Sequence, residues 1–320
     1  MAIKNMEKFD QLKFIKEFIS LGQRQGEIEI KASELIIKYL KNYAVEYFIN
    51  NFQAKIPLTK KAVLLVDNIE VPCKGSSFVS GEINSKDNLI SSLITPLQFD
   101  FFIPNINFNP NSKHISLASH YFAPSVAVNM EGLEKILKGE KVFARVDIEP
   151  LIYESKNILV GNKNNPKNII FAHYDSIEQG ATDNASSIAV LMAIASSFPE
   201  LLRQNLLVFS GNEELSYDQP IYWGHGYRVF EDNYSDIMEK AEKIIVLDCV
   251  GNGETIYDQD KEFIYLAFPL KNLKKWENKI FSMQGSLSKM LKTYHSKGDN
   301  LKQLEEKYLN EALDILIKKL

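Results

Sequence analysis

Three stretches of the sequence decide the fold: NIIFAHYDS at residues 168–176, NLLVFSGNEE at residues 205–214 and KIIVLDCVGNG at residues 243–253. Each begins with a short run of aliphatic residues, which predicts a buried strand, and ends in polar residues. A similar run lies at 157–160, and helical segments at 187–198 and 301–320 alternate with the strands. This alternation predicts an α/β fold, with a central mostly parallel or mixed sheet flanked by helices.

The chain before residue 151 has a different pattern. Apolar spacing predicts helices at 6–21 and 31–42 and strands at 46–56 and 62–66. The next segment is rich in Asn, Ser, Pro and Phe, and its clearest loop-like stretch is FIPNINFNPNSKH at 102–114. It predicts a small β-rich insertion with one clear helix at 130–137. We therefore expect one main domain from residues 1–67 and 151–320, and an inserted subdomain from residues 68–150.

Composition excludes several classes of function. The net charge of −4 comes without a basic stripe, so we expect no nucleic-acid partner. The most apolar stretch, 188–198, is far shorter than the ~20 residues that span a bilayer, so we expect no membrane partner. The N-terminus lacks the apolar core and cleavage site of a secretory signal, which favours a cytoplasmic location.

Cysteine usage restricts any metal site to other ligands. The two cysteines, Cys73 and Cys249, lie far apart and neither is part of a CxxC motif. This argues against a disulfide framework and against a cysteine-rich zinc module. A metal site would therefore use histidine and carboxylate side chains.

Polar residues with metal-binding side chains follow the three predicted strands. They are joined by an aspartate in GATDNASS (180–187) and a histidine in TYHSKGDN (293–300). The residues are His173, Asp175, Asp183, Glu213, Glu214, Asp248 and His295. Singly, each has an ordinary explanation, such as a surface hydrogen bond, a solvated helix start or an N-cap. Together they fall at strand ends or helix starts, and ligands of open α/β sheets bind where strands end.

This residue set suits a site with two metal ions. Zinc binds imidazole nitrogen and carboxylate oxygen, and two ions ~3.5–4 Å apart can share a carboxylate and a water. A further carboxylate that binds no metal can take the proton from that water and pass it to a leaving amine. Adjacent glutamates allow one to bind metal while the other acts as base. The sequence therefore predicts hydrolysis of a peptide amide bond.

The blocks AHYDS, GATDNASS, NEE, VLDCVG and YHSKGD resemble, in order, those of the two-zinc aminopeptidases typified by bacterial leucyl aminopeptidase. Glutamate carboxypeptidases and glutaminyl cyclases are relatives of that family. The resemblance is clear over 152–320 and loose over 6–66. Residues 124–161 also resemble the end of the protease-associated insertion of some relatives, so residues 68–150 could form a lid or a structural decoration.

The resemblance implies a role for each residue. His173 and Asp248 would bind one metal, Glu214 and His295 the other, and Asp183 would bridge them. Glu213 would be the general base. Asp175 would orient the imidazole of His173, and Asp299 would do the same for His295. The implied cofactors are two Zn²⁺ ions, although cobalt or manganese suits the same ligands.

The family pattern is broken after the glutamate pair. LSYDQPIYWGHGYRVF, residues 215–230, replaces a short glycine-rich sequence and carries several aromatic residues, which could line a substrate pocket or pack in the core.

The function expected from these observations is that of a zinc-dependent aminopeptidase, a hydrolase that removes N-terminal residues from a peptide substrate. One alternative is a carboxypeptidase, or glutaminyl-cyclase-like acyl transfer, on the same site. Another, of a different class, is a non-catalytic, metal-stabilised binding protein, against which the retained Glu213 argues. Either a monomer or a homodimer is compatible with the sequence.

Overall fold

A computed structural model describes residues 9–94 and 102–320, so the first three residues of the helix expected at 6–21 lie outside the described part. The chain forms two compact units. The first unit contains the residues through Ala54 together with Tyr153–Leu287 and Asn300–Leu320. The second contains Lys55–Ile152 and Ser288–Asp299. That residues 68–150 are an insertion with a role of its own stays a prediction.

The first unit is built on a mixed sheet. Its strands run in the spatial order β12, β13, β11, β9, β10, β8 and β1. Their bounds are β1 Phe48–Val66, β8 Val142–Gly161, β9 Asn168–His173, β10 Asn205–Ser210, β11 Lys243–Leu247, β12 Ile256–Asp258 and β13 Ile280–Gln284. The four central strands β13, β11, β9 and β10 are parallel, whereas β8 and β12 pair antiparallel to their neighbours. The predicted α/β fold with a mixed sheet is confirmed.

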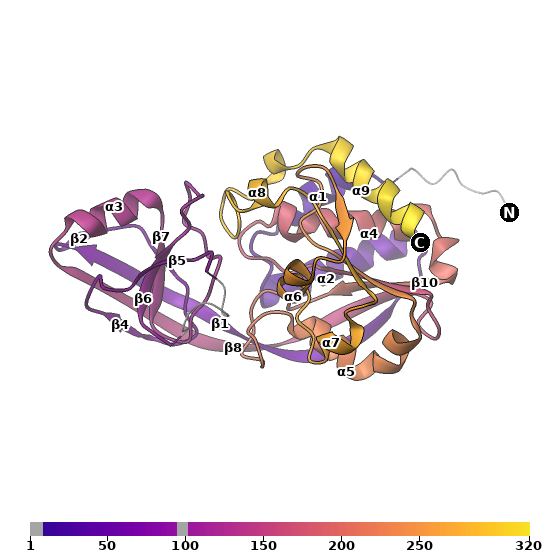
Figure 1. The fold of residues 1–320 in the computed structure, drawn as a ribbon, viewed down its shortest axis with the longest axis horizontal. Helices are drawn as coiled ribbons and strands as arrows, with labels where there is room; N and C mark the ends of the chain where they lie inside the picture. The colour runs from indigo at the N-terminus through magenta and orange to yellow at the C-terminus, as the bar shows by residue number, and fades with distance from the viewer. Residues whose placement is uncertain (1–8, 95–101) are drawn as a thin grey trace. The chain divides into compact units, whose positions relative to one another are not determined.

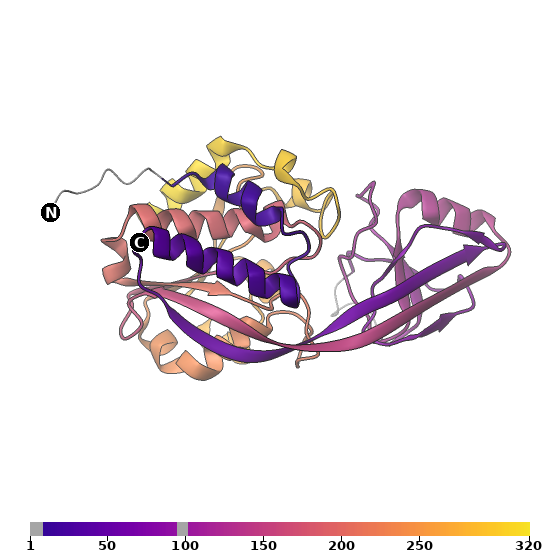
Figure 2. The ribbon, with the colours of Figure 1, turned by 180° about the vertical axis from the view of Figure 1, so that it is seen from behind.

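Helices cover both faces of this sheet (Figure 1). They are α1 Gln11–Ile19, α2 Glu27–Asn42, α4 Ser186–Ser197, α5 His225–Lys240, α6 Lys261–Ala267, α7 Leu273–Trp276 and α9 Glu306–Lys319. In the view from behind, α1 and α2 lie beside α4 on one face (Figure 2). Short α8, Leu287–Met290, lies where the chain passes between the units. None of the described helices is long and apolar enough to cross a bilayer.

The strands supply two cores because successive side chains point to opposite faces of a sheet. Ile170 and Ala172 of β9 pack with α1, α2, α4 and α9, whereas Ile169 and Phe171 pack with α5, α6 and α7. Both cores exclude water, so β9 is apolar from Ile169 through Ala172.

Two local expectations are wrong. β1 runs unbroken where strands were expected at 46–56 and 62–66, because β8 lies beside it and pairs its backbone through the exposed, lysine-containing middle. The stretch 102–114, expected to be a loop, contains β6 (Asn105–Phe108). Its backbone pairs with strands on both sides, which turn signals in the sequence do not reveal.

The second unit has a small sheet of its own, in the order β3, β7, β6 and β5. Its elements are β2 Ile69–Glu70, β3 Lys74–Gly75, β4 Gly81–Ile83, β5 Leu89–Ser91, β6, β7 Ser125–Val128 and α3 Met130–Lys138. The Asn129 side chain accepts a hydrogen bond from the Gly132 amide and so caps α3. β2 pairs with the end of β1 and β4 with the beginning of β8.

Truncating Ile188 to alanine should destabilise the first unit by about 2–5 kcal/mol, because the side chain is fully buried on α4 and its removal leaves a cavity. The measurement is urea unfolding. Ile256→Ala is the control, since that side chain is 45% exposed and its loss should cost less than about 0.5 kcal/mol. Equal losses for the two variants would contradict the assigned core.

Candidate metal centre

The three strand ends picked out in the sequence lie side by side. β9 is the middle strand, with β11 on one side and β10 on the other, all parallel. His173 is the last residue of β9 and pairs with Ser210, the last residue of β10. Asp248 directly follows β11. Parallel strands therefore bring His173, Asp248 and the glutamate pair to one edge of the sheet.

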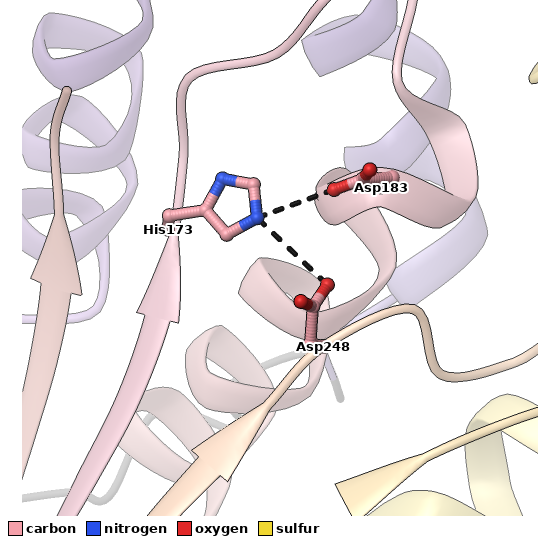
Figure 3. Close-up of side chains that lie close together, drawn as sticks. All are labelled: His173, Asp183 and Asp248. Atoms are coloured by element: carbon pink, nitrogen blue, oxygen red, sulfur yellow. Dashed lines mark ion pairs between the residues drawn. The ribbon is translucent and has the colours of Figure 1, made fainter. Parts of the chain in front are cut away.

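One buried group of metal-binding atoms forms at this edge (Figure 3). The Nε2 atom of His173 lies 3.2 Å from Oδ1 of Asp183 and 3.8 Å from Oδ1 of Asp248. All three ligand atoms lie within 4.8 Å of one another, and two carboxylates so close repel unless a cation lies between them. Imidazole nitrogen and carboxylate oxygen are ligands that zinc accepts. The residues present therefore fit a divalent metal ion.

Asp175 connects this group to the glutamate pair. Its Oδ1 atom lies 3.4 Å from Nδ1 of His173, whereas Asp183 lies at the other ring nitrogen, Nε2. The same carboxylate accepts hydrogen bonds from the backbone amides of Glu213 (3.0 Å) and Glu214 (2.9 Å). One fully buried side chain thus fixes both the β9 end and the turn after β10.

The two adjacent glutamates have different surroundings. Glu214 has a carboxylate oxygen within 4.8 Å of the Asp183 ligand atom, and its Oε1 accepts the Ile177 amide at 3.3 Å. Burial raises the pKa of the Glu213 carboxyl well above its usual value; nearby His173 opposes this rise, and Glu214 and Asp175 add to it. Adjacent in sequence, the two carboxyls thus differ in what surrounds them, as separate roles would require.

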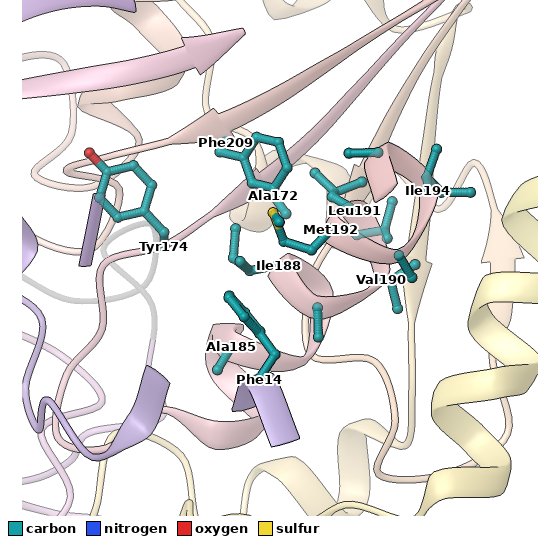
Figure 4. Packing of buried hydrophobic residues seen from close by; sticks show 14 of the residues in the cluster. Phe14, Ala172, Tyr174, Ala185, Ile188, Val190, Leu191, Met192, Ile194 and Phe209 are labelled. Atoms are coloured by element: carbon teal, nitrogen blue, oxygen red, sulfur yellow. The ribbon is translucent and has the colours of Figure 1, made fainter. Parts of the chain in front are cut away.

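Asp183 lies in the segment Ala181–Ala185 that leads into α4, and its backbone there is not helical, with φ −112° and ψ 89°. The helix itself begins at Ser186 with Ala185 as N-cap, so neither Asp183 nor its neighbour Asn184 caps it. The α4 side chains pack closely against β9, β10 and α1 (Figure 4). That packing holds the start of α4, and with it Asp183, against the end of β9.

Asn184 has a positioning role that sequence reasoning missed. Its Nδ2 donates to the Leu247 carbonyl (3.0 Å), and its Oδ1 accepts the Cys249 amide (3.2 Å). The side chain therefore bridges the backbone on both sides of Asp248. The sequence does show Asn184 directly after Asp183, but such a pair before a helix is also typical of an N-cap.

Arg24 was also missed. This fully buried guanidinium donates hydrogen bonds to the carbonyl oxygens of Tyr174 (2.7 Å), Gln179 (2.6 Å) and Gly180 (3.0 Å). These carbonyls belong to the loop between His173 and Asp183. Nothing in the sequence near Arg24 indicates this contact, because its partners lie far away along the chain.

His295 belongs to Ser288–Asp299, which groups with the second unit. Its Nδ1 atom lies 3.1 Å from the carbonyl oxygen of Leu117, and its backbone carbonyl accepts the Leu117 amide. A carbonyl at Nδ1 fixes the tautomer and leaves Nε2 available as a ligand atom.

The residues of the aromatic segment 215–230 make two kinds of contact, some in the core and some within the loop. Tyr227 packs against Phe171 and Phe268 in the core, with ring centroids 5.7 and 4.7 Å away. The buried guanidinium of Arg228 holds the preceding loop by bonds to Asp218 (2.8 Å) and to the Trp223 carbonyl (2.6 Å). The indole of Trp223 donates to the Leu266 carbonyl. The ring of Tyr227 is therefore part of the core.

Comparisons with known proteins find a matching family model and similar folds. Residues 157–265 match the model of peptidase family M28. A search of curated protein sequences finds no match. The fold is similar to that of an aminopeptidase from Aneurinibacillus sp. strain AM-1, at 17% identity and a TM-score of 0.63, with 97% of this chain and 92% of that chain covered.

Other solved structures share the fold. The zinc aminopeptidase BSAP from Bacillus subtilis is 15% identical, with a TM-score of 0.66 over 97% of this chain and 94% of that chain. The glutaminyl cyclase of Tannerella forsythia is 13% identical, with a TM-score of 0.52 over 98% of both chains. The resemblance inferred from the sequence is thereby confirmed, and the segment 157–265, which carries His173, Asp183, the glutamate pair and Asp248, is of the peptidase family M28 type.

Proposed function

We propose that this protein is a zinc-dependent aminopeptidase, which hydrolyses the N-terminal peptide bond of peptide substrates. The carrying observation is the group of His173, Asp183 and Asp248 beside a third carboxyl, Glu213, which is buried. Family M28 peptidases and the zinc aminopeptidase BSAP provide the precedent.

Following the resemblance of the sequence, we assign one ion to His173 and Asp248 and a second to Glu214 and His295, with Asp183 shared between them. The chemistry of the donors supports this assignment, since it gives each ion one imidazole and a carboxylate, with a second carboxylate in common. Bound zinc would supply Lewis-acid polarisation of the scissile carbonyl and a lowered pKa for the attacking water.

The remaining steps fall to the side chains. Glu213 would take a proton from the attacking water and deliver it to the leaving amine, because it is a buried carboxyl that binds no metal in this assignment. Asp175 would hold the His173 ring by its Nδ1 side and keep the turn of Glu213 in place through the two backbone amides.

Metal analysis together with a substrate panel tests this function. We expect close to two zinc ions per chain and hydrolysis of unblocked aminoacyl-anilides, with no hydrolysis of the same compounds after N-acetylation, because an aminopeptidase requires a free α-amine. The N-acetylated anilides are matched controls, because they keep the same aminoacyl group and anilide bond and differ only in the blocked α-amine.

Other outcomes would redirect the proposal. Cleavage of N-blocked peptides at a free C-terminus would indicate a carboxypeptidase, and ring closure of N-terminal glutamine would indicate acyl transfer without water. Zinc binding without turnover of any of these substrates would favour the non-catalytic metal-stabilised protein. Failure to bind zinc would overturn the site itself.

A further inference from the structure

Another buried carboxyl, distant in sequence from the proposed metal ligands, lies against the turn that follows β10. Glu29 is the third residue of α2 and only 1% of it is exposed. It accepts hydrogen bonds from the hydroxyl groups of Tyr153 and Ser155, both on β8. The mechanism above gives this acid no role, although burying a carboxyl is costly unless its partners compensate.

The backbone after β10 passes directly against this carboxyl. A Cβ atom on Gly211 would lie 2.6 Å from Oε1 of Glu29 and 2.5 Å from the Ser155 hydroxyl, so only glycine fits there. The next residue, Asn212, has a φ of 49°, in the left-handed region. Its backbone amide hydrogen bonds to Glu29.

The side chain of Asn212 makes the same connection by a second route. Its Nδ2 donates one hydrogen bond to the Tyr153 hydroxyl (3.3 Å) and another to the Leu215 carbonyl (2.7 Å). The Tyr153 hydroxyl in turn donates to Glu29. The bond to the Leu215 carbonyl closes the turn around Glu213 and Glu214. Asp175 accepts hydrogen bonds from the amides of Glu213 and Glu214. Glu29 therefore holds the beginning of the turn, and Asp175 holds the two glutamates.

We propose that Glu29 is a positioning residue, which fixes the turn after β10 so that Glu213 and Glu214 point in the directions their separate roles require. Two adjacent glutamates can divide base and ligand roles only if the backbone between them keeps one conformation. The roles of Glu213 and Glu214 rest on the proposed function, but the contacts of Glu29 do not.

Glu29 also acts without adding charge near the site. Burial and then the Asp175 carboxylate raise the pKa of Glu29 to about 8, so below that pH the group is mainly a neutral carboxylic acid. Glutamine is a neutral side chain of the same length with one oxygen acceptor, and alanine removes the group altogether. The pair Glu29→Gln and Glu29→Ala therefore separates the hydrogen-bonding role from the mere presence of a side chain.

The experiment compares these variants with Ile36→Ala in the full chain. Ile36 lies on the same helix and is fully buried in the core, so this control lowers stability without touching the turn. For each, kcat and KM are measured on an unblocked aminoacyl-anilide, and zinc affinity by competition with a chromophoric chelator. Thermal unfolding shows that each protein is folded at the assay temperature.

We expect Glu29→Ala to lower kcat and the affinity for the weaker-bound zinc by about 10-fold or more each, as loss of outer supporting partners does. KM should stay within about twofold, and Glu29→Gln should recover most of both losses. If Glu29→Ala matches Ile36→Ala in kcat and zinc affinity, the positioning role is refuted. If the wild type cleaves no substrate but Glu29→Ala still weakens zinc binding, the aminopeptidase proposal fails and the positioning role stands.

Discussion

Replacing Glu213 by glutamine should lower kcat by about 10²–10⁴-fold while metal content stays at the wild-type level. Glutamine fills the same buried space but cannot accept a proton from water. In the proposed assignment Glu213 binds no metal, so the ligand set His173, Asp183 and Asp248 is left intact. The measurement is steady-state hydrolysis of an unblocked aminoacyl-anilide beside metal analysis of the same preparation.

The adjacent residue provides the matched control. Glu214→Gln makes the same chemical change one position along, but there it removes a proposed ligand, so we expect bound metal to fall together with activity. Turnover by Glu213→Gln at the wild-type rate would rule out its role as base. Loss of metal from Glu213→Gln would instead move that residue into the ligand set.

Replacing Asp183 by asparagine should weaken the binding of both ions and abolish turnover. Its Oδ1 atom is 3.2 Å from Nε2 of His173, and a carboxylate oxygen of Glu214 is within 4.8 Å of its ligand atom. A neutral amide there removes a full negative charge from between two proposed cations. Zinc affinity measured by chelator competition should fall by more than about 100-fold, beyond the effect of an outer partner.

Asp175→Asn is the comparison for this variant. Asp175 touches the ring of His173 and two backbone amides but is not part of either proposed ligand set. Its loss should reduce zinc affinity or activity by about 10–100-fold. If Asp183→Asn retained zinc as well as Asp175→Asn does, a shared bridging role for Asp183 would be untenable.

The positions of His173 and Asp248 were predictable because His173 ends and Asp248 directly follows a strand whose central residues are all apolar. Parallel neighbouring strands end at the same edge of the sheet. The strand pattern alone therefore predicts that polar residues at these strand ends lie close together. The order of the strands was not predictable, because several orders give the same sequence pattern. Only the structure shows β9 between β10 and β11.

Residues that act through distant backbone were not predictable. Arg24 binds three carbonyls of a loop about 150 residues away, and Glu29 meets β8 and the turn after β10. In the sequence both are simply charged residues close to the start of a helix, and nothing beside them indicates partners so far along the chain. The long β1 was missed for a related reason, since its backbone partners, not its own side chains, make it a strand.

The core of the first unit also has a consequence for how the protein folds. Phe14 of α1, Ile188 of α4 and Leu309 of α9 lie in one cluster, although they come from the beginning, the middle and the end of the described chain. Chains whose contacts join distant residues pay loop-closure entropy early and fold slowly. Until α9 docks, the apolar surface of α4 beneath it stays open to other chains. Refolding should therefore compete with aggregation, and the yield of native protein should fall as the chain concentration rises.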